Sequence, residues 1–201
     1  LAQDRSDIKF AVKEISRRMS KPRKIDWQRL IKLAQYLKGK ERFIQKYRYQ
    51  EGSAENSNKF INVWVDTDHA GCIETRKSTN GGAVMLNQHN IKTWSSTQSV
   101  ISLSSGEAEY YGMVRGASIG LGITHMLQDL GINRKLRIRT DASAAKSMAA
   151  RKGVGGVRHL EVSQLWLQDR NRKGDLEVEK VKGTFNLADQ FTKFLEGPEV
   201  I

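Results

Sequence analysis

The sequence predicts an α/β fold in which helices flank a five-stranded mixed sheet and a helical extension precedes it. Three short apolar segments separated by turn residues follow one another between residues 60 and 96, as in an antiparallel meander. After them, helical and strand-like patterns alternate, which is typical of an α/β domain. The residues before the first strand carry only helical patterns. We therefore expect the first three strands to be antiparallel and the last two to follow helices.

The N-terminal residues 1–50 predict a helical extension. Apolar residues recur with a 3.6-residue period from Ile8 to Met19. A second helix is expected from Asp26, which can serve as its N-cap, to Gly39. Lys and Arg fill the outer faces of both helices, a pattern that suits either a solvated surface or contact with a phosphate backbone.

A polar segment, residues 51–59, is the best domain boundary in the sequence. It acts as a linker between the extension and residues 60–201, which we expect to form the main domain. Strands are expected there at residues 60–66, 81–87, 90–96, 136–140 and 175–181. Helices are expected at residues 104–128, 142–150, 159–169 and 186–195.

The composition favours a polyanionic partner. The net charge is +12, from 34 Lys and Arg against 22 Asp and Glu. Nucleic acid is the leading candidate and an anionic membrane surface the second, which is less favoured because no strongly amphipathic basic helix with an aromatic face stands out. No apolar run approaches the ~20 residues that span a bilayer either, and no membrane partner is expected. The single Cys72 excludes an internal disulfide and a thiolate metal cluster, and indicates an intracellular chain. The polar start without Met suggests an excised fragment.

Two predicted strands end in an acid. The segment 60–66 is apolar up to Asp66, and the segment 136–140 runs directly into Asp141. If these strands are adjacent and parallel, both carboxylates meet near the centre of the sheet. The alternative is a solvated strand end with turn-forming aspartates. Asp68 is expected to lie already in the turn, so we favour Asp66 over it.

The first long helix offers a choice between two glutamates. Ser104 and Glu107 have the spacing of a capping box, in which the glutamate secures the helix start. Glu107 and Glu109 point roughly 200° apart on a helix, so both cannot face the same site. We therefore choose Glu109 as the inward-facing acid.

A fourth acid, Asp189, lies in the first turn of the last predicted helix, which Asn186 can cap. Together with Asp66, Glu109 and Asp141 it would form a cluster of hard oxygen donors, which suits Mg²⁺ or Mn²⁺ better than zinc. Such acids repel one another by several kcal/mol unless a cation is bound. Two ions ~3.5–4 Å apart can activate water and stabilise the leaving oxygen in phosphodiester hydrolysis.

Six short motifs occur in the order of a known family. They are VDTDHAG, RKSTNG, LSSGEAEY, TDASAA, RHLE and NLADQFTKFL. In this order they resemble the ribonuclease H domain of copia-type (Pseudoviridae-like) LTR retrotransposon polyproteins. Residues 1–50 look like the thumb or connection end of the adjoining reverse transcriptase. They lack the Y-x-D-D signature of a polymerase, so we expect no DNA synthesis from this segment.

The resemblance implies an RNase H-like fold and hydrolysis of the RNA strand of RNA–DNA hybrids, leaving a 3′-hydroxyl and a 5′-phosphate. It implies two Mg²⁺ ions, with Mn²⁺ able to substitute, held by the catalytic acids Asp66, Glu109, Asp141 and Asp189. Asp66 is then the ligand shared by both ions. The implied partners are the RNA–DNA hybrid and the reverse transcriptase portion of the same polyprotein. The implied location is intracellular, in the cytoplasm, in virus-like particles or in the nucleus.

The sequence departs from cellular members of this family in two places. They carry a histidine in the loop before the last helix, where this chain has residues 183–186 without one. Bacterial members also have a long basic handle, where this chain has only the short loop 151–158. His159 is compatible with a structural contact at a helix start or with approach to the substrate.

Several polar residues are candidates for contact with the nucleic acid: Arg76, Lys77, Ser78, Ser104, Ser105, Arg158 and His159. Each has an ordinary alternative, because loop charges can simply be solvated and serines at a helix start can simply cap it. Two other functions also remain open. One is a catalytically silent module that binds hybrid or scaffolds a polymerase, and the other is a DNA-cleaving integrase or resolvase of the same fold.

Overall fold

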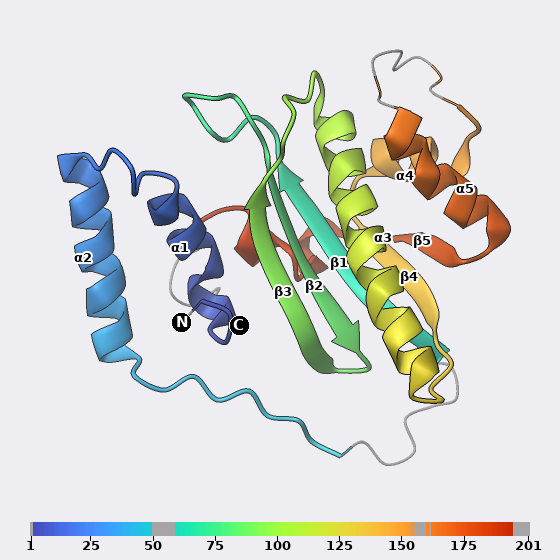
Figure 1. Ribbon diagram of the computed structural model, residues 1–201, viewed down its shortest axis with the longest axis horizontal. Helices are drawn as coiled ribbons and strands as arrows, with labels where there is room; N and C mark the ends of the chain where they lie inside the picture. Colours follow the sequence, from blue (N-terminus) through green and yellow to red (C-terminus); the bar gives the residue numbers. More distant parts are fainter. Residues whose placement is uncertain (1, 50–58, 154, 156–159, 161, 195–201) are drawn as a thin grey trace.

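The computed structural model describes residues 2–49, 59–153, 155, 160 and 162–194. Five strands form one mixed sheet in the order β3-β2-β1-β4-β5 (Figure 1). Their bounds are β1 Phe60–Asp68, β2 Thr79–Leu86, β3 His89–Thr97, β4 Lys135–Thr140 and β5 Leu176–Lys180. The first three strands are antiparallel, and β4 runs parallel to both β1 and β5. The predicted mixed sheet is therefore confirmed.

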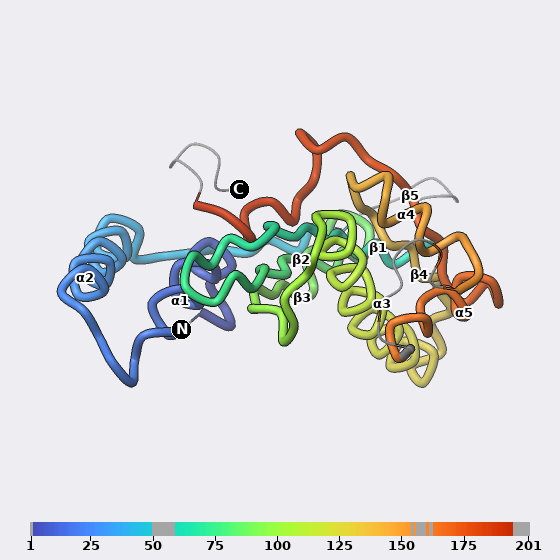
Figure 2. The backbone as a smooth tube through the Cα atoms, turned by 90° about the horizontal axis from the view of Figure 1, so that it is seen from above, coloured from blue at the N-terminus to red at the C-terminus, as the bar shows by residue number. Residues whose placement is uncertain are grey.

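Helices lie before the sheet and between its strands. Their bounds are α1 Lys9–Ser16, α2 Lys24–Gly39, α3 Ser105–Asp129, α4 Ser143–Ala150 and α5 Trp166–Lys173. Short 3-10 helices are η1 Ser6–Ile8, η3 Val162–Leu165, η4 Gly183–Phe185 and η5 Asp189–Phe191. Figure 2 shows α3 on one side of the sheet and the chain that follows β5 on the other. No helix in the described part of the chain is long and apolar enough to cross a membrane.

The central strand β1 packs closely against α3. Ile61, Val63 and Val65 alternate along β1 and are fully buried. Gly116 of α3 lies directly over Val65, because a Cβ added to this glycine would come 2.4 Å from the valine Cγ1 atom. Glycines also stand one turn before and one turn after Gly116. This row of small residues lets the helix lie close to the sheet, with its N-terminal half beside the end of β1.

The prediction of a helix over residues 186–195 was wrong for its described part, where only the single turn η5 is helical. Tertiary contacts hold this segment in an irregular path. The Asn186 Nδ2 atom donates to the Val65 carbonyl oxygen at 2.9 Å, and the Ser95 hydroxyl donates to the Phe191 carbonyl oxygen at 2.6 Å. Phe191 is fully buried. The sheet therefore binds the Phe191 carbonyl oxygen, which a regular helix would use internally, and holds the start of the segment through the Asn186 side chain.

Several boundaries differ from those predicted. Asp68 is the last residue of β1 and not part of the turn, because its carboxylate accepts a hydrogen bond from the Thr79 N–H. Arg23 is the N-cap of α2, and Asp26 lies at the third helical position, where it accepts from the Arg23 N–H at 3.1 Å. The turn between β2 and β3 falls at residues 87–88, where Asn87 has a φ of 55°.

The helix predicted at residues 159–169 begins later, as η3, and α5 continues it to Lys173. The predicted start of this helix and most of the basic loop 151–158 lie outside the described residues. The predicted linker 51–59 also lies almost wholly outside them.

The first helix of the extension packs against the edge of the sheet. The Lys9 Nζ atom donates to the Thr93 carbonyl oxygen on β3 at 3.0 Å. The Phe10 ring meets the Phe194 ring edge-on, with 4.8 Å between centroids. In contrast, α2 contacts mainly α1 and projects away from the sheet (Figure 1). Trp27 on α2 is accordingly 63% exposed.

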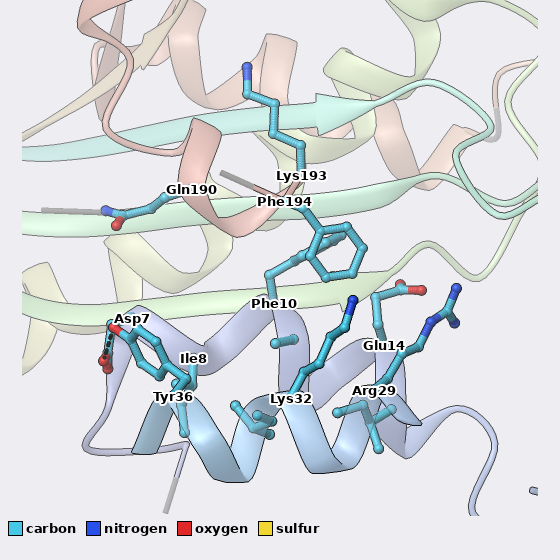
Figure 3. A pocket seen from close by; sticks show the side chains of 13 residues that line it. Asp7, Ile8, Phe10, Glu14, Arg29, Lys32, Tyr36, Gln190, Lys193 and Phe194 are labelled. Carbon is cyan, nitrogen blue, oxygen red and sulfur yellow. Dashed lines mark hydrogen bonds between the residues drawn. The ribbon is translucent and has the colours of Figure 1, made fainter. Parts of the chain in front are cut away.

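A mostly apolar pocket of about 370 Å³ is lined by residues of α1, α2 and the C-terminal segment (Figure 3). Ile8, Phe10 and Tyr36 line one wall, and Phe194 lines the other. Lys193 stands at its rim and points away from these apolar side chains. The extension and the C-terminal segment are therefore in contact at the pocket.

Candidate metal centre

Three acids from three different elements meet at the end of the central strands. Asp66 lies on β1, Asp141 directly follows β4, and Glu109 lies on α3. One carboxylate oxygen from each lies within 4.8 Å of the other two. The parallel register explains the first two positions. It pairs Trp64 with Arg139, so Asp66 stands opposite Asp141 two residues further along.

The two glutamates of α3 have different surroundings. Glu107 is 1% exposed, and its carboxylate accepts from the Leu103 N–H and the Tyr111 hydroxyl, both at 2.8 Å. Ser104 caps the helix by accepting from the Glu107 N–H at 3.2 Å. The predicted N-cap is thus present. The Glu107 carboxylate, however, accepts from the N–H of Leu103, the residue before the N-cap, and not from the N–H of Ser104 itself. Glu107 therefore secures the helix start.

Glu109 instead points into the acid cluster. Its Oε2 atom is buried and has no hydrogen-bond partner among the described residues. A buried carboxylate oxygen without a donor is costly unless another group satisfies it. A divalent cation between the three carboxylates would do so, and the oxygen donor set suits Mg²⁺ or Mn²⁺.

The fourth predicted acid lies at the margin of this cluster. Asp189 belongs to η5, and its carboxylate pairs with the Lys193 ammonium at 2.5 Å. It is not one of the three acids whose oxygens lie within 4.8 Å of one another. Its charge nevertheless reaches the cluster, because it raises the pKa of Asp66.

Burial and mutual repulsion raise the pKa values of two acids in the cluster, Asp66 and Glu109. Burial raises the pKa of Asp66 to about 6, with the Thr192 hydroxyl opposing this and the charges of Asp189 and Asp141 adding to it. Burial raises the pKa of Glu109 to about 9, and the charges of Asp66 and Asp141 contribute further. The fully ionised cluster is therefore unfavourable in the protein alone, and a bound cation would offset that cost.

The residues predicted to contact nucleic acid fall into different environments. Arg76 is exposed and Lys77 half-buried in the loop between β1 and β2. Ser78 is fully buried in that loop, and its hydroxyl accepts from the Ala70 N–H at 2.9 Å, so it does not face solvent. Ser105 is exposed as the first residue of α3.

Ser104 is also exposed, and its hydroxyl serves as the cap of α3. Arg158 and His159 lie outside the described residues.

Sequence reasoning missed the two residues that follow Phe191. The Thr192 hydroxyl donates to the Asp66 carboxylate, and Lys193 forms the ion pair with Asp189. Their spacing of three and four residues from Asp189 was the available signal, since such residues meet on a helical turn.

No protein-family model matches the chain. One sequence relative is the retrovirus-related Pol polyprotein from transposon TNT 1-94 of Nicotiana tabacum, which is 26% identical over 191 residues. The match covers 94% of this chain and 14% of that polyprotein. Another is the Pol polyprotein from transposon RE1 of Arabidopsis thaliana, 29% identical over 199 residues, covering 96% of this chain and 13% of its own length. The chain is thus similar, over nearly its whole length, to part of these retrovirus-related Pol polyproteins.

These Pol relatives are much longer, and the chain spans no more than 14% of the two described above. Among solved structures, LC11-RNase H1, isolated from compost by a metagenomic approach, aligns with a TM-score of 0.48 and 16% identity. That alignment covers 67% of this chain and 93% of LC11-RNase H1. The sheet order and flanking helices of this chain are those expected of an RNase H-like fold. Together with the similarity to the Pol polyproteins, this fold fits an RNase H domain of a copia-type polyprotein, as the six motifs predicted.

Proposed function

We propose that the chain is a metal-dependent endoribonuclease that hydrolyses the RNA strand of RNA–DNA hybrids during retrotransposon reverse transcription. The observation that carries this proposal is the convergence of Asp66, Glu109 and Asp141, with carboxylate oxygens within 4.8 Å of one another. The RNase H-like fold and the relationship to Pol polyproteins support the choice of substrate.

The proposed chemistry is phosphodiester hydrolysis with two Mg²⁺ ions, for which Mn²⁺ can substitute. The ions would supply charge for the attacking water and for the leaving oxygen. Asp66 would be shared between them, as the resemblance implies, and the charges of both Asp141 and Asp189 act on it. The expected products are a 3′-hydroxyl and a 5′-phosphate.

The uneven distribution of positive charge supports hybrid binding. Residues 1–49 hold 15 of the 34 Lys and Arg and 5 of the 22 Asp and Glu. This quarter of the chain therefore carries +10 of the net charge of +12. Lys21, Lys24 and Lys32 are exposed there. A surface of this kind attracts a phosphate backbone without reading its sequence.

The basic extension also reaches the loop that follows β1. Glu74 in this loop pairs with Arg18 and, at 3.1 Å, with Arg23 at the connection between α1 and α2. Arg76 and Lys77 follow in the same loop. We therefore include the α1–α2 connection and this loop in one proposed surface for the hybrid backbone.

A cleavage assay tests the proposal. Labelled RNA–DNA, RNA–RNA and DNA–DNA duplexes are each incubated with the chain and Mg²⁺, Mn²⁺ or EDTA. We expect cleavage of the RNA strand of the hybrid with either metal and none with EDTA. Binding of hybrid without cleavage would favour a silent scaffolding module, and cleavage of DNA–DNA would favour an integrase or resolvase activity. Either result would contradict the proposed function.

We also propose that the reverse transcriptase portion of the same polyprotein is a partner, since the relatives are Pol polyproteins. An intracellular location, in the cytoplasm, in virus-like particles or in the nucleus, belongs to the same proposal.

A further inference from the structure

Thr192 lies where the C-terminal segment crosses the end of β1. It is 2% exposed, and its hydroxyl donates to the Asp66 Oδ2 atom. The same hydroxyl lies 3.0 Å from the Asp189 carbonyl oxygen. A hydroxyl has a single proton to donate, and a carboxylate is a stronger acceptor than a neutral carbonyl. The interaction with Asp66 is therefore the dominant one.

A glycine in the sheet makes room for this contact. Gly81 of β2 is paired with Asp66 of β1 in the antiparallel register. A Cβ added to Gly81 would come 2.6 Å from the Thr192 Cγ2 atom and 2.9 Å from the Phe191 Cβ atom. The C-terminal segment thus occupies the space of the missing side chain. Any side chain larger than hydrogen at residue 81 would displace Thr192 or Phe191 and so disturb the contact between Thr192 and Asp66.

The neighbouring residue fixes Thr192 from the other side. Phe191 is fully buried, and its carbonyl oxygen accepts from the Ser95 hydroxyl of β3 at 2.6 Å. Because both the side chain and the backbone of Phe191 are held, the position of the Thr192 hydroxyl is set by the sheet.

We propose that Thr192 is a positioning residue that orients the Asp66 carboxylate for metal binding. A hydrogen bond to one carboxylate oxygen restricts rotation of the group and leaves the other oxygen free to bind a cation. Partners of metal ligands commonly change metal affinity by about 10- to 100-fold when removed. This inference rests on the proposed metal-dependent function.

The test measures Mn²⁺ binding to the protein without substrate, by electron paramagnetic resonance of the free ion, in the full chain and in Thr192→Val and Thr192→Ser. Valine keeps the shape of threonine but lacks the hydroxyl, whereas serine keeps the hydroxyl. We expect Thr192→Val to bind Mn²⁺ about 10- to 100-fold more weakly and Thr192→Ser to retain most of the parent affinity.

A matched control is available on α3. Thr124 is also buried, at 5% exposure, and its hydroxyl donates to the Gly120 carbonyl oxygen at 2.9 Å. Thr124→Val therefore removes a buried hydroxyl that does not contact the acids, and we expect parent Mn²⁺ affinity from it. Gly81→Ala disturbs the same contact without changing Thr192, because the added Cβ would collide with the threonine side chain. We therefore expect it to weaken Mn²⁺ binding as well. Thermal melting of each variant shows whether it is folded.

The outcomes separate this inference from the proposed function. Parent affinity in Thr192→Val, or equal losses in Thr192→Ser and Thr192→Val, would overturn the role of Thr192 while leaving the metal site in place. Absence of Mn²⁺ binding to the parent chain would overturn the metal site and this inference together.

Discussion

The acids of the cluster differ, in the charges that surround them, from two acids beside the α1–α2 connection, Asp26 of α2 and Glu74 of the loop after β1. At the connection, Asp26 is buried beside Arg23, whose side chain donates to it at 2.9 Å and lowers its pKa. Glu74 pairs with Arg18 and Arg23, and the hydrogen bond from Arg18 lowers its pKa. In the cluster, by contrast, the pKa values of Asp66 and Glu109 are raised by burial and by neighbouring acids.

The difference shows which acids the protein neutralises with its own cations. The acids at the connection are satisfied by arginines and join the extension to the loop after β1. The cluster lies in a chain with a net charge of +12, yet its buried Glu109 Oε2 atom finds no donor among the described residues. We interpret the first group as structural and the second as a site that needs an external cation.

Replacing one acid from each group gives the largest expected contrast. Asp66→Asn should lower the rate of hybrid cleavage by about 1000-fold or more, because a ligand shared by both ions is removed; this corresponds to about 4 kcal/mol of transition-state stabilisation. The variant should remain folded, since it removes a repulsive charge. Cleavage kinetics and thermal melting measure both effects.

Asp26→Asn is the matched change in the other group. It should leave the cleavage rate unchanged and lower the melting temperature, because Arg23 loses its charged partner. Equal cleavage rates for Asp66→Asn and the parent chain would refute the assignment of the cluster.

The two glutamates of α3 provide the next contrast. Glu109→Gln should abolish most cleavage without loss of stability. Glu107→Gln should keep Mn²⁺ binding but destabilise the fold by about 1.5–3 kcal/mol, because charged hydrogen bonds to Leu103 and Tyr111 are weakened. Urea unfolding and Mn²⁺ titration compare the two variants. The opposite pattern would show that Glu107 is the metal ligand.

The pH dependence of stability provides a third contrast. The folded pKa of Glu109 is about 9, well above its ordinary value of 4.5. The folded state therefore binds more protons than the unfolded state between these values, and this group costs stability as the pH rises through that range. In EDTA, Glu109→Gln should gain melting temperature relative to the parent at about pH 8 and much less at about pH 5.

Added Mg²⁺ should remove this advantage of Glu109→Gln at about pH 8, because the cation stabilises the ionised cluster of the parent chain only. A difference between the two proteins that does not change with pH or Mg²⁺ would argue against a buried, repulsive site.

The smallest effect is expected from the basic extension. Replacing Lys21, Lys24 and Lys32 by Gln should weaken hybrid binding. It should also reduce the slope of the logarithm of affinity against the logarithm of salt concentration, by up to about one unit for each phosphate that the variant no longer neutralises. Binding is measured in EDTA, so that no substrate is cleaved.

A matched set of lysines lies at the opposite end of the strands from the acids. Lys59 precedes β1, Lys135 begins β4 and Lys173 ends α5, and all three are exposed. Their replacement by Gln should change hybrid affinity and its salt dependence much less. Equal losses from both sets would indicate that only the total charge matters.

Much of this arrangement could be predicted from the sequence, because local patterns determined it. The apolar run before Asp66 and the one before Asp141 predicted two strands, and their parallel pairing brought both acids to one place. The spacing of Glu107 and Glu109 on a helix decided which of them could face inward.

The C-terminal segment could not be predicted in the same way. Asn186 and Phe191 are held by β1 and β3, so contacts distant in the sequence override the helical pattern. The hydrogen bond from the Thr192 hydroxyl to Asp66 depends on this irregular path of the C-terminal segment, so it could not be predicted from the sequence. Ser78 was misjudged for a related reason, since its hydroxyl is used within its own loop.

The most direct test of the metal centre is a crystal grown with Mn²⁺ and examined by anomalous diffraction. We expect anomalous peaks that mark Mn²⁺ ions bound by oxygen atoms of Asp66, Glu109 and Asp141. Mn²⁺ peaks at other places only, with these three carboxylates free of metal, would contradict the account.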